Sequence, residues 1–190
     1  SNEARDQDGP LAQQVNRQTR LMSEQVEHHL RRARAAAHAR TIGARAPVER
    51  TLDDLGRTLQ KIYGRQGITL SWACEGPIVF RGEKQDLEEL LGNLIDNACK
   101  WAADTVNVTA SLRDGQVFLC VEDDGPGLTP EQSEAVLARG VRLDEQAPGT
   151  GLGLAIVVDL ARAYDGSLEL DRSTMGGLKA CLWLPALLES

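Results

Sequence analysis

Apolar and polar positions follow two different periods along this chain. Apolar residues spaced three, four or seven apart predict helices over residues 11–39, 48–67, 83–104 and 152–166. Apolar runs, or apolar residues that alternate with polar ones, predict strands over residues 68–73, 78–82, 105–112, 116–123, 167–171 and 178–185. Strands and helices therefore mix along most of the sequence.

Turn residues indicate how these elements are joined. Asp114-Gly115 lies between two strand patterns and predicts a hairpin, as does the segment 175–177. Thr129 as N-cap and Pro130 in the first turn predict a short helix over residues 129–138, and residues 139–150 are predicted to form a long loop. The expected fold is α+β, a two-layer sandwich in which helices cover one face of an antiparallel-rich sheet.

The helix predicted over residues 11–39 differs from the others. It lacks Gly and Pro, and its apolar residues form a narrow seam that must pack against another helix. Gly43 and Pro47 interrupt the pattern. We therefore expect two units: residues 1–42, a helix whose partner is another chain or a missing segment, and residues 43–190, a globular domain.

Charge follows the same division. Residues 1–46 hold eight basic and five acidic side chains, whereas the remainder holds 13 basic and 23 acidic ones, which makes the net charge −7. An acidic body argues against broad nucleic-acid binding. No apolar run is long enough for a membrane span. The four cysteines, none in a CxxC pair, are interpreted as small core residues in a reducing compartment.

Polar residues that could carry chemistry occur in three places. Asn93, Asn97 and Lys100 share one stripe of the helix 83–104, where carboxamides can ligate Mg²⁺ and a lysine can meet phosphate. The stretch "EDDGPG" (122–127) follows an apolar strand and could place a carboxylate in a pocket. Taken singly, the first could be a solvated helix face and the second an ordinary turn.

The third place is "GTGLGL" (149–154), which precedes a helix. Dense glycine exposes backbone N–H groups at a helix N-terminus, an arrangement that binds anions. The spacing is not the dinucleotide GxGxxG, because Leu154 occupies the last glycine position, and no GK[ST] of a P-loop follows. The motif alone is a weak phosphate signal.

Together and in this order, "NLIDNACKWA", "DDGPGL" and "GTGLGL" resemble the ATP-binding domain of sensor histidine kinases. This domain belongs to the superfamily with the Bergerat-type fold that includes gyrase-type topoisomerases, MutL-type repair ATPases and chaperone ATPases. The resemblance covers about residues 47–185, and the spelling is most similar to PhoQ-like kinases. It implies ATP and Mg²⁺ as cofactors, with Asn97 as the Mg²⁺ ligand and Asn93 as its companion.

The resemblance also implies roles for the other residues. Lys100 would contact phosphate, Asp123 would accept the adenine amino group, and Trp101 would lie beside adenine or be a core aromatic. Close approach of base and phosphates would depend on Gly125, Gly127, Gly149, Thr150, Gly151, Leu152 and Gly153. Arg142 matches a basic position in the loop over the nucleotide. Two positions depart from the pattern: Leu137 replaces a phenylalanine and Ala147 a basic residue.

One position separates kinases from hydrolases. Hydrolytic relatives carry Glu four residues before the Mg²⁺ asparagine, whereas Asn93 cannot act as a general base. The implied activity is therefore transfer of the γ-phosphate to a histidine. His28, His29 and His38 lack the acidic neighbour and proline of the acceptor motif, so the acceptor is expected outside this chain. The resemblance implies that residues 1–42 are the second helix of a dimerisation hairpin whose first helix, with the acceptor, is absent, and that residues 43–190 are the ATP-binding catalytic domain.

Further partners follow only from the resemblance. They are a response regulator, for which the similarity to PhoQ-like kinases implies a PhoP-like one, a second copy in a homodimer, and the bacterial inner membrane, reached on its cytoplasmic side and only through an upstream part. Two alternatives remain. One is a nucleotide-sensing module with little catalysis. The other is an anti-sigma-type serine kinase, against which the long helix before the nucleotide domain argues.

Overall fold

A five-stranded sheet forms one layer of the computed structural model, which describes residues 43–139 and 153–188. Its order is β2-β4-β5-β7-β6, and the strands span Thr69–Cys74 (β2), Thr105–Arg113 (β4), Gln116–Asp123 (β5), Ser167–Arg172 (β6) and Leu178–Pro185 (β7). Three neighbouring pairs are antiparallel, and only β2 runs parallel to its neighbour β4. The predicted antiparallel-rich sheet is confirmed.

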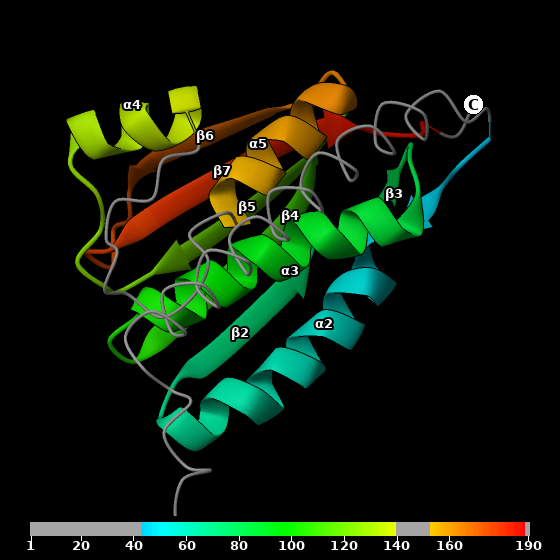
Figure 1. Cartoon of the computed structure of the whole chain (residues 1–190). Coiled ribbons are helices and arrows are strands. Elements are labelled where there is room, and N and C mark those ends of the chain that lie inside the picture. Colours follow the sequence, from blue (N-terminus) through cyan, green and yellow to red (C-terminus); the bar gives the residue numbers. More distant parts are fainter. Residues whose placement is uncertain (1–42, 140–152, 189–190) are drawn as a thin grey trace, which may run out of the picture.

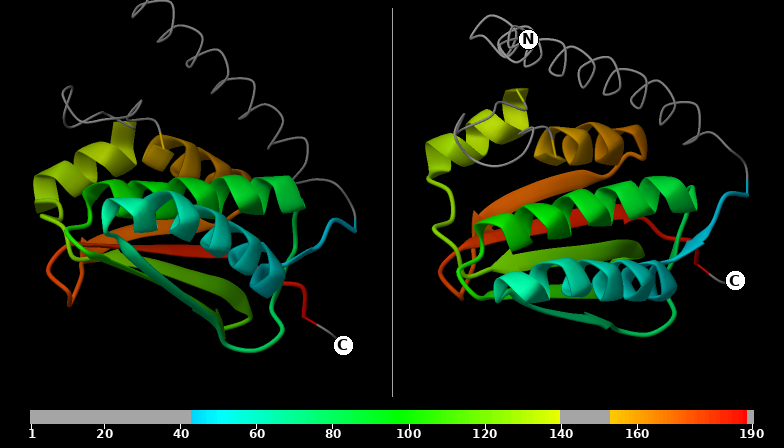
Figure 2. Two further views of the ribbon diagram at one scale, coloured as in Figure 1. Left: turned by 90° about the horizontal axis from the view of Figure 1, so that it is seen from below. Right: turned by 60° about the horizontal axis from the view of Figure 1, so that its bottom comes forward.

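The helices form the second layer. They are α2 (Val48–Tyr63), which continues into a 3₁₀ turn at Gly64–Gln66, α3 (Lys84–Trp101), α4 (Pro130–Arg139) and α5 (Gly153–Ala163). Figures 1 and 2 show α2, α3 and α5 side by side over one face of the sheet, with α3 in the middle and α4 beyond α5. The α+β two-layer sandwich is therefore confirmed.

The apolar stripe of α3 explains why this helix lies at the centre. Its residues at spacings of three and four are at most 3% exposed: Leu87, Leu90, Leu91, Leu94, Ile95 and Ala98. They pack against inward-facing strand residues such as Val106, Leu119 and Leu182. Burial of each large aliphatic side chain contributes roughly 1.5–3 kcal/mol, so this face fixes α3 on the sheet and leaves its polar stripe outside the core.

Local signals in the sequence explain two connections. Asp114 and Gly115 have φ angles of 49° and 76°, and two positive φ values are what a two-residue type I′ hairpin requires. At the start of α4, the N–H of Gln132 donates to Thr129 Oγ1 and the N–H of Thr129 donates to Gln132 Oε1. This reciprocal pair is a capping box, and it confirms Thr129 as the N-cap.

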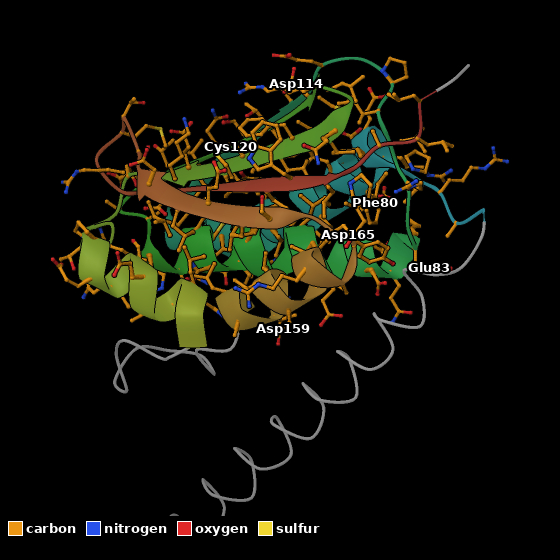
Figure 3. The ribbon with its side chains drawn as sticks, turned by 90° about the horizontal axis from the view of Figure 1, so that it is seen from above. Phe80, Glu83, Asp114, Cys120, Asp159 and Asp165 are labelled. Carbon is orange, nitrogen blue, oxygen red and sulfur yellow. A yellow bond between two sulfur atoms is a disulfide. The ribbon has the colours of Figure 1, made fainter. Side chains whose placement is uncertain are left out.

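A second, two-stranded sheet pairs β1 (Ala46–Pro47) with β3 (Val79–Phe80). The segment 78–82 was predicted as a strand, but its partner β1 was not, because two residues carry no periodicity. Phe80 is fully buried and contacts Tyr164 edge-on with a ring-centroid distance of 4.9 Å. Figure 3 shows Phe80 near Glu83, at the end of the molecule where α3 begins.

The prediction for the cysteines was wrong for one pair. Cys120 on β5 and Cys181 on β7 are opposite residues in the antiparallel register, and they form a disulfide with a Cα–Cα distance of 4.2 Å. Cys120 lies on the sheet face away from the helices (Figure 3). No sequence pattern indicated this pairing, because 61 residues separate the two cysteines and only the strand pairing brings them together. Cys99 is a buried free thiol, as predicted, and Cys74 is a half-buried one.

The long helix predicted over residues 11–39 lies outside the described residues, and so does most of the predicted loop 139–150. Among the helices that the structure describes, none has the length and apolar character to span a membrane.

Candidate functional site

A cavity of about 960 Å³ opens where the end of α3, the exit of β5, α4 and the end of β6 meet. This volume lies at the upper end of the range for small-molecule sites. Four of the residues predicted for binding line the cavity: Asn97, Trp101, Asp123 and Gly127. The other walls include Thr129 and Leu137 from the α4 region and Arg172 from β6.

Asp123 is the buried carboxylate of this cavity, with 2% of its surface exposed. Its Oδ1 accepts hydrogen bonds from the N–H groups of Gly125 (2.9 Å) and Leu178 (3.1 Å). Burial raises the pKa of Asp123, and the two backbone hydrogen bonds partly oppose the increase. Because both bonds end on Oδ1, the other carboxylate oxygen of this cavity-lining residue is left for a donor on a ligand.

Two glycines make room for this carboxylate. A Cβ on Gly177 would overlap Asp123 Oδ1, and a Cβ on Gly125 would overlap the main-chain oxygen of Trp101. Gly125 was predicted as a site residue. Gly177 and Leu178 were missed, because "MGG" was interpreted only as a hairpin turn; the second glycine directly before a strand was the available signal.

Asp124, the next residue, is hydrogen-bonded to the backbone of the segment that follows α3. Its carboxylate accepts hydrogen bonds from the N–H groups of Ala103, Asp104 and Thr105 at 2.8–3.2 Å. Burial acts to raise the pKa of Asp124, but these hydrogen bonds outweigh it, so the pKa lies below its ordinary value. Asp124 thereby links the segment after α3 to the end of β5, the two elements that carry Asn97 and Asp123. It was not predicted as a site residue.

The polar stripe of α3 is only partly directed at the cavity. Asn97 lines it, and Trp101 is a wall residue with 42% of its surface exposed, so Trp101 is not a core aromatic. Asn93 donates from Nδ2 to the main-chain oxygen of Glu89 at 2.8 Å. The Nζ of Lys100 lies 2.5 Å from Asp96 Oδ2. Neither Asn93 nor Lys100 is among the residues that line the cavity.

The glycine-rich segment enters the described structure only at Gly153, the first residue of α5. A Cβ there would come within 3.2 Å of Asn93 Oδ1, so the N-terminus of α5 lies directly against the polar stripe of α3. The start of α5 and the polar stripe of α3 therefore lie together, and Asn97 of α3 shares the cavity with the β5 exit. Five further predicted residues lie outside the described residues: Arg142, Gly149, Thr150, Gly151 and Leu152.

Comparison with known proteins places this arrangement in a family. A family model described as "Histidine kinase-, DNA gyrase B-, and HSP90-like ATPase" matches residues 82–188, more than half of the chain. The chain belongs to this family. The matched residues of this chain include every described element that lines the cavity, from α3 to β7.

Named relatives within the family are sensor kinases. The chain is 42% identical over 181 residues to the sensor protein kinase CarS of Pseudomonas aeruginosa, covering 93% of this chain and 39% of that protein. It is 34% identical over 169 residues to the sensor protein PhoQ of Escherichia coli K12, covering 89% of this chain and 34% of that protein. The chain thus spans little more than a third of these relatives.

A solved structure agrees. The crystal structure of full-length ShkA in complex with AMPPNP superimposes with a TM-score of 0.72 at 28% identity, over 95% of this chain and 38% of that one. The similarity to histidine kinases inferred from the three motifs is confirmed.

Proposed function

We propose that this chain is the ATP-binding catalytic part of a two-component sensor histidine kinase. The observation that carries the proposal is the buried carboxylate of Asp123, held on one oxygen at a cavity that Asn97 and Trp101 also line. Membership of the ATPase family and the similarity to sensor kinases support it.

Adenine would bind at the Asp123 end of the cavity. The unused carboxylate oxygen would accept the adenine amino group, which guanine lacks at that position. The absence of side chains at Gly125 and Gly127 lets the turn after β5 pack closely against Trp101 and Gly177, and the exposed ring of Trp101 would form a wall beside the base. A polar group built to accept one specific donor discriminates strongly against ligands without it.

The phosphates would extend from Asn97 toward the N-terminus of α5. Backbone N–H groups from Gly153 and the preceding residues Gly149–Leu152 would meet them, with Lys100 and Arg142 as the cationic side chains. Within the described residues no group of three His, Cys, Asp or Glu side chains could hold a metal. Mg²⁺ is commonly held by one or two protein ligands together with phosphates and waters. Asn97, with Asn93 beside it, would hold Mg²⁺, and the ion would neutralise phosphate charge.

Asn93 supports transfer rather than hydrolysis. A carboxamide cannot activate water as a base, and the Nδ2 of Asn93 is already bonded to its own helix. Phosphoryl transfer depends mainly on positioning and charge stabilisation, which this site could supply. The γ-phosphate would go to a histidine outside this chain, because His28, His29 and His38 lack the acceptor motif, and then to a PhoP-like response regulator. We place the reaction in a homodimer on the cytoplasmic side of the membrane.

Calorimetric titration with AMPPNP and Mg²⁺ tests the binding step. We expect the unmodified chain to bind, Asn97→Ala to lose binding, and a surface variant such as Glu88→Gln to retain it. Unchanged affinity of Asn97→Ala would remove this residue from the site.

Incubation with γ-labelled ATP tests the transfer step. The chain alone should stay unlabelled, and a histidine-bearing dimerisation hairpin supplied in trans should acquire acid-labile label. Acid-labile label on His28 or His29 would refute the assignment of the acceptor. Nucleotide binding without any transfer in trans would favour the sensing module.

A further inference from the structure

One carboxylate on α3 joins two partners from opposite directions. Tyr63, the last residue of α2, donates from its hydroxyl to Asp96 Oδ1 at 2.5 Å. The ammonium of Lys100 lies 2.5 Å from the second oxygen, Oδ2. Asp96 therefore connects a tyrosine of the neighbouring helix to a lysine one turn further along its own helix.

The two ends of this connection differ in their surroundings. Tyr63 is only 8% exposed. Burial, followed by the hydrogen bond to Asp96, raises the pKa of Tyr63 far above its ordinary value, so its hydroxyl remains a donor. The Lys100 and Asp96 side chains are 32% and 38% exposed, and an ion pair at such a surface adds little to stability. The buried Tyr63 thus holds the Asp96 carboxylate, and the ion pair of that carboxylate with Lys100 contributes little to stability.

The position of Lys100 suggests what the pairing is for. Lys100 follows Asn97 by three residues and Asp96 by four, so it is a helix-surface neighbour of both. Asn97 lines the cavity, whereas Asp96 is turned toward α2. A lysine has a flexible four-carbon stem, and a fixed partner restricts the positions that its ammonium can take.

We propose that Tyr63 and Asp96 form a positioning pair that holds Lys100 for the phosphates of the bound nucleotide. The inference rests on the proposed function, because it takes Lys100 as a phosphate contact. Tyr63 fixes the carboxylate, the carboxylate restricts the lysine stem, and the ordering of Lys100 precedes nucleotide binding. Ordering one long side chain during binding costs affinity by about three- to tenfold, and the pair removes this loss.

The test measures affinity for ligands that differ in their phosphates. Asp96→Asn keeps an acceptor for Tyr63 but loses the charge that holds Lys100. Its affinity for Mg²⁺-AMPPNP should fall about three- to tenfold, whereas its affinity for adenosine should not change. Tyr63→Phe should shift the AMPPNP affinity in the same direction by less. In a Lys100→Met background, Asp96→Asn should have no further effect.

A matched control lies on the same helix. Glu88→Gln breaks the Lys84–Glu88 pair, an exposed pair with the same four-residue spacing and an N–O distance of 3.0 Å, at the other end of α3. It should leave both affinities unchanged. An equal loss with Glu88→Gln, or an equal loss for adenosine, would reduce Asp96 to a structural role.

Two other results would overturn the proposal. Tighter AMPPNP binding by Asp96→Asn would show that Asp96 competes with the phosphates for Lys100. An additive effect in the Lys100→Met background would show that Asp96 does not act through the lysine. Failure of the proposed function is distinguishable from both, because the unmodified chain would then bind neither adenosine nor AMPPNP.

Discussion

The hydroxyl of Tyr164 donates a 2.5 Å hydrogen bond to Oδ2 of Asp86 and thereby joins the end of the α5 region to the first turn of α3. Asp86 is 7% exposed, and the same hydroxyl accepts the N–H of Glu83 at 3.3 Å. Since α3 carries Asn97 and α5 begins beside Asn93, this bond helps to set the distance between the two helices that flank the proposed phosphate site.

Removal of this hydroxyl should be costly. Tyr164→Phe takes one donor from a buried carboxylate, and hydrogen bonds to charged groups contribute about 1.5–3 kcal/mol. We expect the free energy of unfolding in urea to fall by that amount. Tyr63→Phe is the matched control, because it removes a bond of the same length to a more exposed carboxylate, Asp96, and should cost about 1 kcal/mol or less. Equal losses would contradict the importance of burial.

The disulfide gives a prediction that thiol titration can check. Protein unfolded in denaturant without reductant should show two reactive thiols, from Cys74 and Cys99, and four after reduction. In the folded state Cys74 should react before the buried Cys99. Four thiols without reductant would instead support the first expectation from the sequence, that all the cysteines are free.

Periodic patterns predicted the elements well and their neighbours poorly. The segment 178–185 was predicted with the bounds that β7 has, because every second residue faces the core. The patterns did not indicate that β2 pairs with β4 in parallel and that β3 belongs to another sheet. The apolar face of a strand indicates that one side of the strand is buried, but this pattern does not identify the adjacent strand.

The site shows the same limit. Asp123 and Asn97 were found because each belongs to a short motif that is contiguous in the sequence. Asp124 and Gly177 were not, because their roles exist only after folding: Asp124 accepts from residues 103–105, and Gly177 lies against a carboxylate 54 positions earlier in the chain. No local pattern of hydrophobicity or charge marks such contacts.

Gly177 should therefore be as sensitive as the motif glycines. Gly177→Ala places a methyl group on Asp123 Oδ1 and on the main chain of Asp123 and Gly125, so the carboxylate and the turn that holds it must move. We expect the protein to fold and its affinity for adenine nucleotides to fall at least about tenfold, which corresponds to about 1.4 kcal/mol. Calorimetry with AMPPNP measures this loss.

The matched control for this variant is Gly92→Ala on α3. Among the described residues, no atom outside the local helix backbone and the two chain neighbours lies within 4 Å of the added methyl group, and alanine is the better helix former. Gly92→Ala should bind nucleotide normally and be up to about 1 kcal/mol more stable. Normal binding by Gly177→Ala would show that Asp123 tolerates displacement and would weaken its assignment to adenine.

The adjacent carboxylates Asp123 and Asp124 should affect stability with opposite dependence on pH. The native pKa of Asp123 is raised above the ordinary value of 3.8. As the pH rises from 3.8 through the native pKa, the native state holds a proton that the unfolded state has lost, so the Asp123 contribution to stability decreases with pH. The native pKa of Asp124 is lowered below 3.8. Its contribution is present above that value and is lost as the pH falls through the native pKa.

Neutral variants isolate these two contributions. The free energy of unfolding of Asp123→Asn, relative to that of the unmodified chain, should increase as the pH rises from about 3.5 to about 7. The variant gains relative stability because it no longer carries a buried charge. For Asp124→Asn the relative free energy of unfolding should decrease as the pH rises from below the lowered native pKa of Asp124 to above 3.8, because the charge that accepts hydrogen bonds from the N–H groups of residues 103–105 is missing. Urea titrations at several pH values give the pH dependence of both differences. Slopes of the same sign would contradict the different roles of the two carboxylates, since Asp123 is buried at the cavity and Asp124 is hydrogen-bonded to the backbone.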